Sequence, residues 1–484
     1  MFKSKFLFIL IFFISIASYS SEAFDVSISG VFPGAEGKIV RLVKYDDLIT
    51  YRQSVIEECE INDKEEFEFH FTIYEPQYLM FRIDHAKLGM FVEPGKNYRL
   101  TFEPVNFNEL DDKRNPYLEP YYFPFEINNA DNNSLDALID SLDNLFDSFV
   151  AENFSSNQRI RLGHKVIDFH EKTDSLFSNV DNDYFNNYYK YKFAKYYRVT
   201  NAFNDHELAL RYFYNQEILY NNLEYMSFFN NYFDNYIFST TGNVRIEDVV
   251  YTVNELSSYT ALMDSLGRDS ILRNEVLREM VLLKSLSNIY SDDDFVQANV
   301  EDVINQVAKD SKFAEHRKIA KNILWAQKHL RQGSPAPDFT LKDESGKEYT
   351  LEDFEGKFLY LSFFTSWCVP CMAEFPVKED LYQEYGDIIE FVSISVDRHK
   401  FDYERFLREN DFSWKFFHFD DNYALLDDYD VTSFPVFVLI DPDGNIISYP
   451  SLYPSIAIRG YLDKLRQIYQ MEKNKKPQLY YDLE

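Results

Sequence analysis

The stretch FFTSWCVPCMAEFP at residues 363–376 decides the fold of the C-terminal part of the chain. It joins an apolar run at residues 358–364 to a segment of helical character from about Cys368 to Tyr385. A buried strand followed directly by a helix is typical of an α/β sheet. The two cysteines, Cys368 and Cys371, therefore lie at the predicted N-terminus of a helix.

This position favours a reactive thiolate. The first backbone N–H groups of a helix have no partner within it, and they carry a partial positive charge. The pKa of a cysteine in a C-x-x-C motif can fall there from about 8.5 to about 3.5–7.5. We expect Cys368, nearer the helix end and the solvent, to be the attacking thiolate and Cys371 to resolve the mixed disulfide. The motif predicts a redox dithiol.

Other uses of the cysteine pair are less favoured. A zinc site needs two more ligands, and the sequence has no second C-x-x-C and no H-E-x-x-H among its nine histidines. A purely structural disulfide would close a loop too short to add much stability. No metal and no cofactor is expected. The third cysteine, Cys59, is expected to be a free structural thiol, and a regulatory or intermolecular partner of Cys368 is the alternative.

Strands and helices alternate downstream of residues 333–337 (GSPAP). Strands are expected at residues 389–396, 436–440 and 446–449, and helices at about 401–410 and 455–470. The sequence DPDG at residues 441–444 is a hairpin signal between the last two strands. This alternation predicts an α/β domain.

The chain upstream has a different character. Residues from about 24 to 104 alternate as half-buried strands do, most clearly at Phe67, Phe69, Phe71 and Ile73. They predict a small antiparallel β-sandwich, followed by an irregular connection from Pro104 to Pro124.

The next two hundred residues contain no proline up to Pro335 and almost no glycine. Apolar residues follow helical spacing from Leu135 to Phe149 behind a predicted Ser134 N-cap. The Tyr-, Phe- and Asn-rich tract at residues 186–238 is expected to form helix core, and a ligand-stacking surface is the alternative. This region is predicted to be an α-helical domain.

The N-terminus predicts export. Lys3 and Lys5 precede the apolar run Phe6–Ala17, and small residues follow it. These features are typical of a secretory signal peptide, with an uncleaved anchor or a buried strand or helix as alternatives. No cysteine lies near the cleavage region, so a lipid anchor on cysteine is not expected.

Length and charge limit the function classes. A chain of 484 residues is expected to hold two or three domains at roughly 100–200 residues each. Its 49 basic and 80 acidic residues give a net charge of −31, which repels phosphate backbones and argues against nucleic-acid binding.

Residues from about 334 to 470 resemble the thioredoxin-like domain of exported thiol–disulfide oxidoreductases of the TlpA/ResA type. Besides residues 363–376, the matching landmarks are APDF at 336–339, GK at 346–347, residues 351–357, VTSFP at 431–435 and DPDG at 441–444. The resemblance covers about a quarter to a third of the chain. The order of the two upstream regions is also similar to that of larger TlpA-like proteins.

The resemblance implies roles for individual residues. Pro435 would be cis and lie against a redox-active Cys368–Cys371 disulfide, where it would help to bind the substrate backbone together with Phe434. Trp367 would flank the nucleophile and shape substrate access. Glu374 matches a family carboxylate that could exchange a proton with the Cys371 thiol if it is partly buried. A solvated helix charge is the alternative for Glu374. The segment at residues 450–454 lacks a family glycine, so no binding residue is assigned there.

The predicted architecture is multidomain, with the α/β thioredoxin-like fold at the C-terminus. The expected segments are a signal peptide at residues 1–23, a β-sandwich-like domain at 24–104, a mainly α-helical domain at 105–333, the thioredoxin-like domain at 334–470 and a C-terminal tail at 471–484.

The function predicted is a thiol–disulfide oxidoreductase that acts on protein disulfides, as a reductant in the periplasm or another exported location. A membrane-embedded thiol donor would re-reduce it. A binding module with the thioredoxin-like domain as scaffold is the first alternative. A peroxiredoxin-like peroxidase is the second, and it is disfavoured because Leu361 stands where that site has proline.

Overall fold

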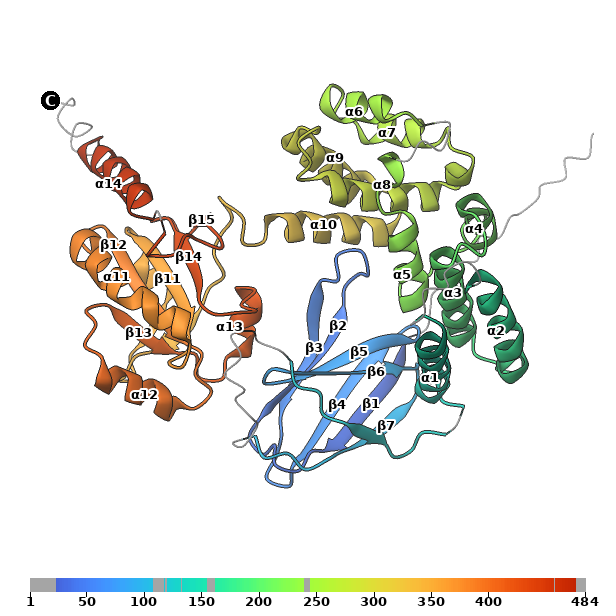
Figure 1. Ribbon diagram of the computed structural model, residues 1–484, viewed down its shortest axis with the longest axis horizontal. Coiled ribbons are helices and arrows are strands. Elements are labelled where there is room, and N and C mark those ends of the chain that lie inside the picture. Colours follow the sequence, from blue (N-terminus) through green and yellow to red (C-terminus); the bar gives the residue numbers. More distant parts are fainter. Residues whose placement is uncertain are drawn as a thin grey trace, which may run out of the picture.

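The computed structural model describes residues 23–107, 117, 120–131, 133–154, 162–238, 244–456 and 458–475 (Figure 1). The predicted signal peptide, up to residue 22, and the chain beyond residue 475 lie outside the described residues. Within those ranges, none of the helices has both the length and the apolar character needed to cross a membrane.

The N-terminal part consists of two four-stranded sheets, ordered β4-β1-β7-β8 and β3-β2-β5-β6. We call this part the β-domain. Its strands are β1 (Phe24–Val31), β2 (Ile39–Tyr45), β3 (Gln53–Glu60), β4 (Glu66–Ile73), β5 (Gln77–Ile83), β6 (Ala86–Val92), β7 (Asn97–Phe102) and β8 (Phe125–Ile127). Because β8 pairs with β7, we place the end of the β-domain after Ile127 rather than at residue 104.

The period-2 pattern of β4 buries Phe67 and Phe69, while Glu66, Glu68 and His70 face solvent. The ring of Phe81, on β5 of the other sheet, lies 6.2 Å from the ring of Phe67 and 6.3 Å from that of Phe69. The two sheets therefore share one core. The strands pair antiparallel as predicted except β1 and β7, which pair in parallel. Their connection runs through the other sheet, so no hairpin forces an antiparallel pairing.

Ten α-helices follow in the described part of the middle region. They are α1 (Leu135–Asn153), α2 (Leu162–Phe177), α3 (Asp183–Val199), α4 (Asp205–Tyr212), α5 (Leu223–Tyr232), α6 (Ile246–Asn254), α7 (Tyr259–Leu266), α8 (Glu275–Ile289), α9 (Gln297–Asp310) and α10 (Ala314–Lys328). The predicted N-cap of α1 is confirmed, because the Ser134 side chain accepts a hydrogen bond from the N–H of Ala137.

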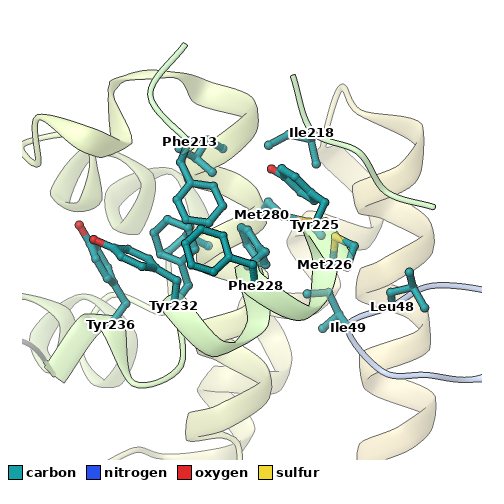
Figure 2. Packing of buried hydrophobic residues seen from close by; sticks show 14 of the residues in the cluster. Leu48, Ile49, Phe213, Ile218, Tyr225, Met226, Phe228, Tyr232, Tyr236 and Met280 are labelled. Atoms are coloured by element: carbon teal, nitrogen blue, oxygen red, sulfur yellow. The ribbon is translucent and has the colours of Figure 1, made fainter. Parts of the chain in front are cut away.

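The aromatic tract at residues 186–238 forms helix core, as predicted. Figure 2 shows Phe213, Phe228 and Tyr232 packed side by side, with Tyr225 close to them. Phe228 and Tyr225 have no exposed surface, and the rings of Phe213 and Phe228 stack at 5.0 Å. These rings are therefore occupied by packing and not displayed for a ligand.

The loop between β2 and β3 inserts into the helical region. Its Leu48 and Ile49 belong to the helical core and lie near Met226 of α5 (Figure 2). The carboxylate of Asp47 accepts a hydrogen bond from the Asn322 amide of α10 at 2.7 Å. Side chains of the β-domain thus take part in the core of the helical region, which is distinct from the core between the two sheets.

A partly buried carboxylate joins these two parts at a second place. Asp136 of α1 accepts a hydrogen bond from the N–H of Phe91 at 2.8 Å, and burial raises its pKa to about 6. The pKa of aspartate in an unfolded chain is about 3.9, so the folded state holds this proton more tightly. Stability is therefore lost as the pH rises from about 4 to about 6.

At pH 7.5 the free energy of unfolding of Asp136→Asn is expected to be about 1–2 kcal/mol higher than that of the wild type. The asparagine carries no charge at this partly buried position, and its side-chain oxygen can still accept the hydrogen bond from Phe91. At pH 4 the two proteins should be equally stable. Denaturant unfolding at both pH values measures this. Asp147→Asn, on the exposed face of α1, is the control. An equal effect of Asp136→Asn at both pH values would contradict the prediction.

The C-terminal part is the predicted α/β domain, which we call the thioredoxin-like domain. Its elements are β9 (Thr340–Lys342), β10 (Glu348–Thr350), β11 (Phe358–Phe364), α11 (Val369–Tyr385), β12 (Ile389–Ser395), α12 (Lys400–Glu409), β13 (Lys415–His418), α13 (Tyr423–Asp428), β14 (Val436–Ile440), β15 (Ile446–Ser448) and α14 (Ile458–Lys475).

A five-stranded sheet of order β13-β12-β11-β14-β15 lies at its centre. Strand β11 pairs in parallel with β12 and antiparallel with β14, and all seven of its residues are buried, as a central strand requires. Among the described residues, the core around this sheet takes no side chain from before Leu330. It is thus separate from the other two cores.

Candidate active site

The C-x-x-C motif lies where β11 ends and α11 begins. Cys368 is the N-cap of α11, and its Sγ accepts a hydrogen bond from the N–H of Cys371 at 3.2 Å. The two cysteines form a disulfide, and each is only 2% exposed. The structure therefore places the pair at the helix N-terminus that the sequence predicted.

This geometry suits thiol–disulfide exchange. After reduction, the N–H of Cys371 and the positive end of the α11 dipole stabilise a negative charge on Cys368 Sγ. Cys371 lies inside the first turn and is held within bonding reach of the same sulfur. The outer cysteine can thus attack, and the inner one can close the disulfide.

The loop before β14 lies beside this site. Its Phe434–Pro435 peptide bond is cis. The Phe434 ring meets the Trp367 ring edge-on at 6.4 Å, which brings together two of the side chains predicted to bind substrate. Tyr453 donates a hydrogen bond from its hydroxyl to the carbonyl of Pro435 at 3.5 Å.

Glu374 is not the solvated helix charge that was its alternative. Its side chain faces the interior of the domain, and the residue is 9% exposed. Its carboxylate accepts hydrogen bonds from the N–H of Ser455 at 2.8 Å and from the Ser455 hydroxyl at 2.7 Å. Glu374 lies three residues after Cys371 on α11, so the two side chains are neighbours on the same side of the helix.

A second buried carboxylate, which sequence reasoning missed, anchors the loop before Cys368. Asp397 is 1% exposed, and it accepts hydrogen bonds from the N–H and hydroxyl of Ser366, both at 2.9 Å. The Ser395 hydroxyl donates to it at 2.7 Å. Burial raises the pKa of Asp397 in spite of these donors. The sequence signal that could have identified Asp397 is its position just after β12, the strand that pairs in parallel with β11.

Asp397 is a positioning residue, and its removal is expected to loosen the loop. In Asp397→Ala the Ser366 N–H loses its acceptor, which should lower the free energy of unfolding by about 2–3 kcal/mol. The pKa of Cys368, measured from the pH dependence of its alkylation, should rise because Sγ is no longer fixed at the helix end. Asp402→Ala, at an α12 surface pair with Arg405, is the control. An unchanged Cys368 pKa would limit Asp397 to a structural role.

Lys378, further along α11, has no exposed surface and was also missed. Its Nζ lies 2.7 Å from the Ser362 hydroxyl of β11 and 2.8 Å from the Ser393 hydroxyl of β12. Burial holds the pKa of Lys378 well below its usual range. These contacts fix α11, and with it the dithiol, to the two central strands.

Cys59 is distant in the fold from this site. It lies half-buried on β3 of the β-domain as a free thiol, and burial raises its pKa. Across the described ranges, no three His, Cys, Asp or Glu side chains gather as a set of metal ligands.

The fold and site define a thioredoxin-like domain with a C-x-x-C dithiol at the start of its first long helix. Residues 331–455 match the family model described as Redoxin. The thiol-disulfide oxidoreductase ResA of Bacillus subtilis is 33% identical over 128 residues, which cover 26% of this chain and 71% of that protein. ResA of Oceanobacillus iheyensis is 36% identical over 133 residues, or 26% and 69% of the two chains.

The chain therefore belongs to the ResA-type thiol–disulfide oxidoreductases, and it is an enzyme of that class. Among solved structures, the thioredoxin domain of a thiol-disulfide oxidoreductase from Bacteroides vulgatus is 29% identical, covering 25% of this chain and 89% of that one with a TM-score of 0.24. The family model matches the thioredoxin-like domain and includes neither the β-domain nor helices α1–α10.

Proposed function

We propose that the chain is an exported reductant of protein disulfides that works through Cys368 and Cys371. The observation that carries the proposal is the position of Cys368 as the N-cap of α11, with the N–H of Cys371 directed at its sulfur. The resemblance of residues 334–470 to exported family members supports export, as do Lys3, Lys5 and the apolar run after them.

The reaction begins with the reduced dithiol. The Cys368 thiolate attacks one sulfur of a substrate disulfide, forms a mixed disulfide, and releases the other substrate sulfur as a thiolate that takes up a proton. Cys371 then loses its proton and attacks Cys368 Sγ, which releases the second substrate thiol. Two electrons pass to the substrate, and the Cys368–Cys371 disulfide is the product in the enzyme.

Four residues assist in this scheme. Glu374, held by Ser455, accepts the proton of Cys371 and returns it when the disulfide is reduced again. Trp367 and Phe434 form the surface beside the sulfur, and Pro435 orients the substrate backbone. The enzyme takes its own electrons from a membrane-embedded thiol donor.

The direction of electron flow is tested in cells that make the full chain. Rapid acid quenching followed by alkylation traps the redox state of the dithiol. We expect Cys368 and Cys371 to be mainly reduced at steady state, since a reductant fed by a donor must wait for substrate in that form. A mainly oxidised pair would make the protein an oxidant and would overturn this proposal.

A further inference from the structure

The β-domain contacts the thioredoxin-like domain through charged and aromatic side chains. Arg82 of β5 forms a bidentate ion pair with Asp427 of α13, in which Nη1 and Nη2 lie 2.5 and 2.9 Å from the two carboxylate oxygens. Lys38 lies 3.5 Å from Asp421, and the ring of His85 stacks on that of Tyr423 at 6.2 Å. All three contacts fall on α13 or just before it.

Helix α13 leads directly into one wall of the dithiol site. It ends at Asp428, and the chain then runs to the Phe434–Pro435 bond. At this wall Ser433 forms an isolated antiparallel bridge with Tyr117, from the connection that follows β7.

The opposite wall is contacted as well. Arg398 follows Asp397, whose carboxylate anchors the Ser366 loop. The Arg398 side chain donates a hydrogen bond to the carbonyl of Phe107, beyond β7, and its guanidinium lies 5.7 Å from the centre of the Tyr121 ring. The chain around the β-domain therefore touches both loops that flank Cys368.

The two cysteines of the dithiol have little exposed surface in this arrangement, whereas Val369 between them is exposed. Exchange requires a third sulfur to approach Cys368 Sγ, so its rate depends on access. Cys368 is only 2% exposed, and Cys371 is covered to the same extent. Some part of the surroundings must move before a disulfide within a folded protein can reach the sulfur.

The interface with the thioredoxin-like domain is the one suited to such a movement. The β-domain contributes Leu48 and Ile49 to the core of the helical region. Its contacts with the thioredoxin-like domain include ion pairs, a hydrogen bond, a backbone bridge and ring contacts. Among the described residues, the core of that domain takes no side chain from the β-domain. Polar interfaces between domains of one chain permit relative motion.

We propose that the β-domain is an intramolecular gate on the dithiol, held closed by the Arg82–Asp427 ion pair. While it is docked, it holds the two loops beside Cys368 in place and limits access by protein disulfides. Opening moves the thioredoxin-like domain away from the unit formed by the β-domain and the helices. This inference rests on the proposed function, since it concerns access to the same cysteines.

The test measures insulin disulfide reduction by the full chain in the presence of dithiothreitol. Arg82→Glu and Asp427→Arg each place like charges together and should raise the rate by up to about fivefold, the largest change expected when a partly exposed ion pair is lost. The double variant restores opposite charges and should return to the wild-type rate. Reduction of 5,5′-dithiobis(2-nitrobenzoate), a small disulfide, should rise less.

Arg99→Glu, on the exposed side of β7, is the matched control and should leave both rates unchanged. Near-ultraviolet circular dichroism confirms that each variant is folded, and restoration in the double variant excludes simple misfolding. Unchanged or slower insulin reduction in both single variants, or failure of the double variant to restore the rate, would overturn the gate. Absence of all exchange in the wild-type protein would instead overturn the proposed function.

Discussion

Replacing Cys368 with serine is expected to lower protein disulfide reduction by at least about a hundredfold, because a hydroxyl at this position cannot replace the thiolate nucleophile. Cys371→Ser should lose turnover to a similar extent for a different reason. It keeps the attacking thiolate at the helix N-terminus but cannot release the mixed disulfide. The two variants therefore distinguish the two sulfurs.

The measurement is insulin reduction, together with non-reducing electrophoresis of the protein after incubation with a disulfide substrate. Cys371→Ser should accumulate a covalent adduct, and Cys368→Ser should form none. Cys59→Ser, which changes a thiol on β3 of the β-domain, is the control and should keep full activity. An adduct on Cys368→Ser and none on Cys371→Ser would reverse the assignment of roles.

Replacing Glu374 with glutamine should slow the second step about a hundredfold, the usual contribution of a positioned acid or base. The amide has the shape of the carboxylate, and its oxygen can still accept a hydrogen bond from Ser455. It cannot take the proton of Cys371. Attack by Cys368 on the substrate should be little affected, since that thiolate depends on the helix N-terminus.

Single-turnover kinetics with a preformed mixed disulfide on Cys368 isolate this step. The rate of release should fall in Glu374→Gln, while the rate of attack by Cys368 on a substrate disulfide should stay close to that of the wild type. Ser455→Ala, which removes only the hydroxyl donor, should give a smaller effect. An equal loss in the attack and release steps would show that Glu374 acts on the shape of the site and not on the proton.

The central elements of the thioredoxin-like domain could be predicted because each carries a strong local pattern. Strand β11 is apolar except for Ser362, and α11 follows from the motif and its capping cysteine. The elements missed were β9, β10, β13 and α13, which are too short to show a period. The parallel pairing of β1 with β7 was missed because it joins strands far apart in the sequence.

The part of the site that lies within the C-x-x-C segment could be predicted from the sequence. Cys368, Cys371 and Glu374 share one helix, so their spacing alone relates them. The hydrogen bonds from Ser455 to Glu374 and from Ser366 to Asp397 join segments that only the folded sheet brings together. The burial of Lys378 could not be predicted because a lysine on a helix usually faces solvent.

The central claim is that Cys368 and Cys371 form a reducing dithiol, and the reduction potential of this pair tests it most directly. The full chain is equilibrated against glutathione or dithiothreitol buffers of known potential, and the fraction of disulfide is measured. The account predicts a reversible two-electron couple near that of thioredoxin, at about −270 mV or lower. A value near −120 mV, which is typical of a disulfide-forming oxidant, or the absence of any reversible couple would contradict it.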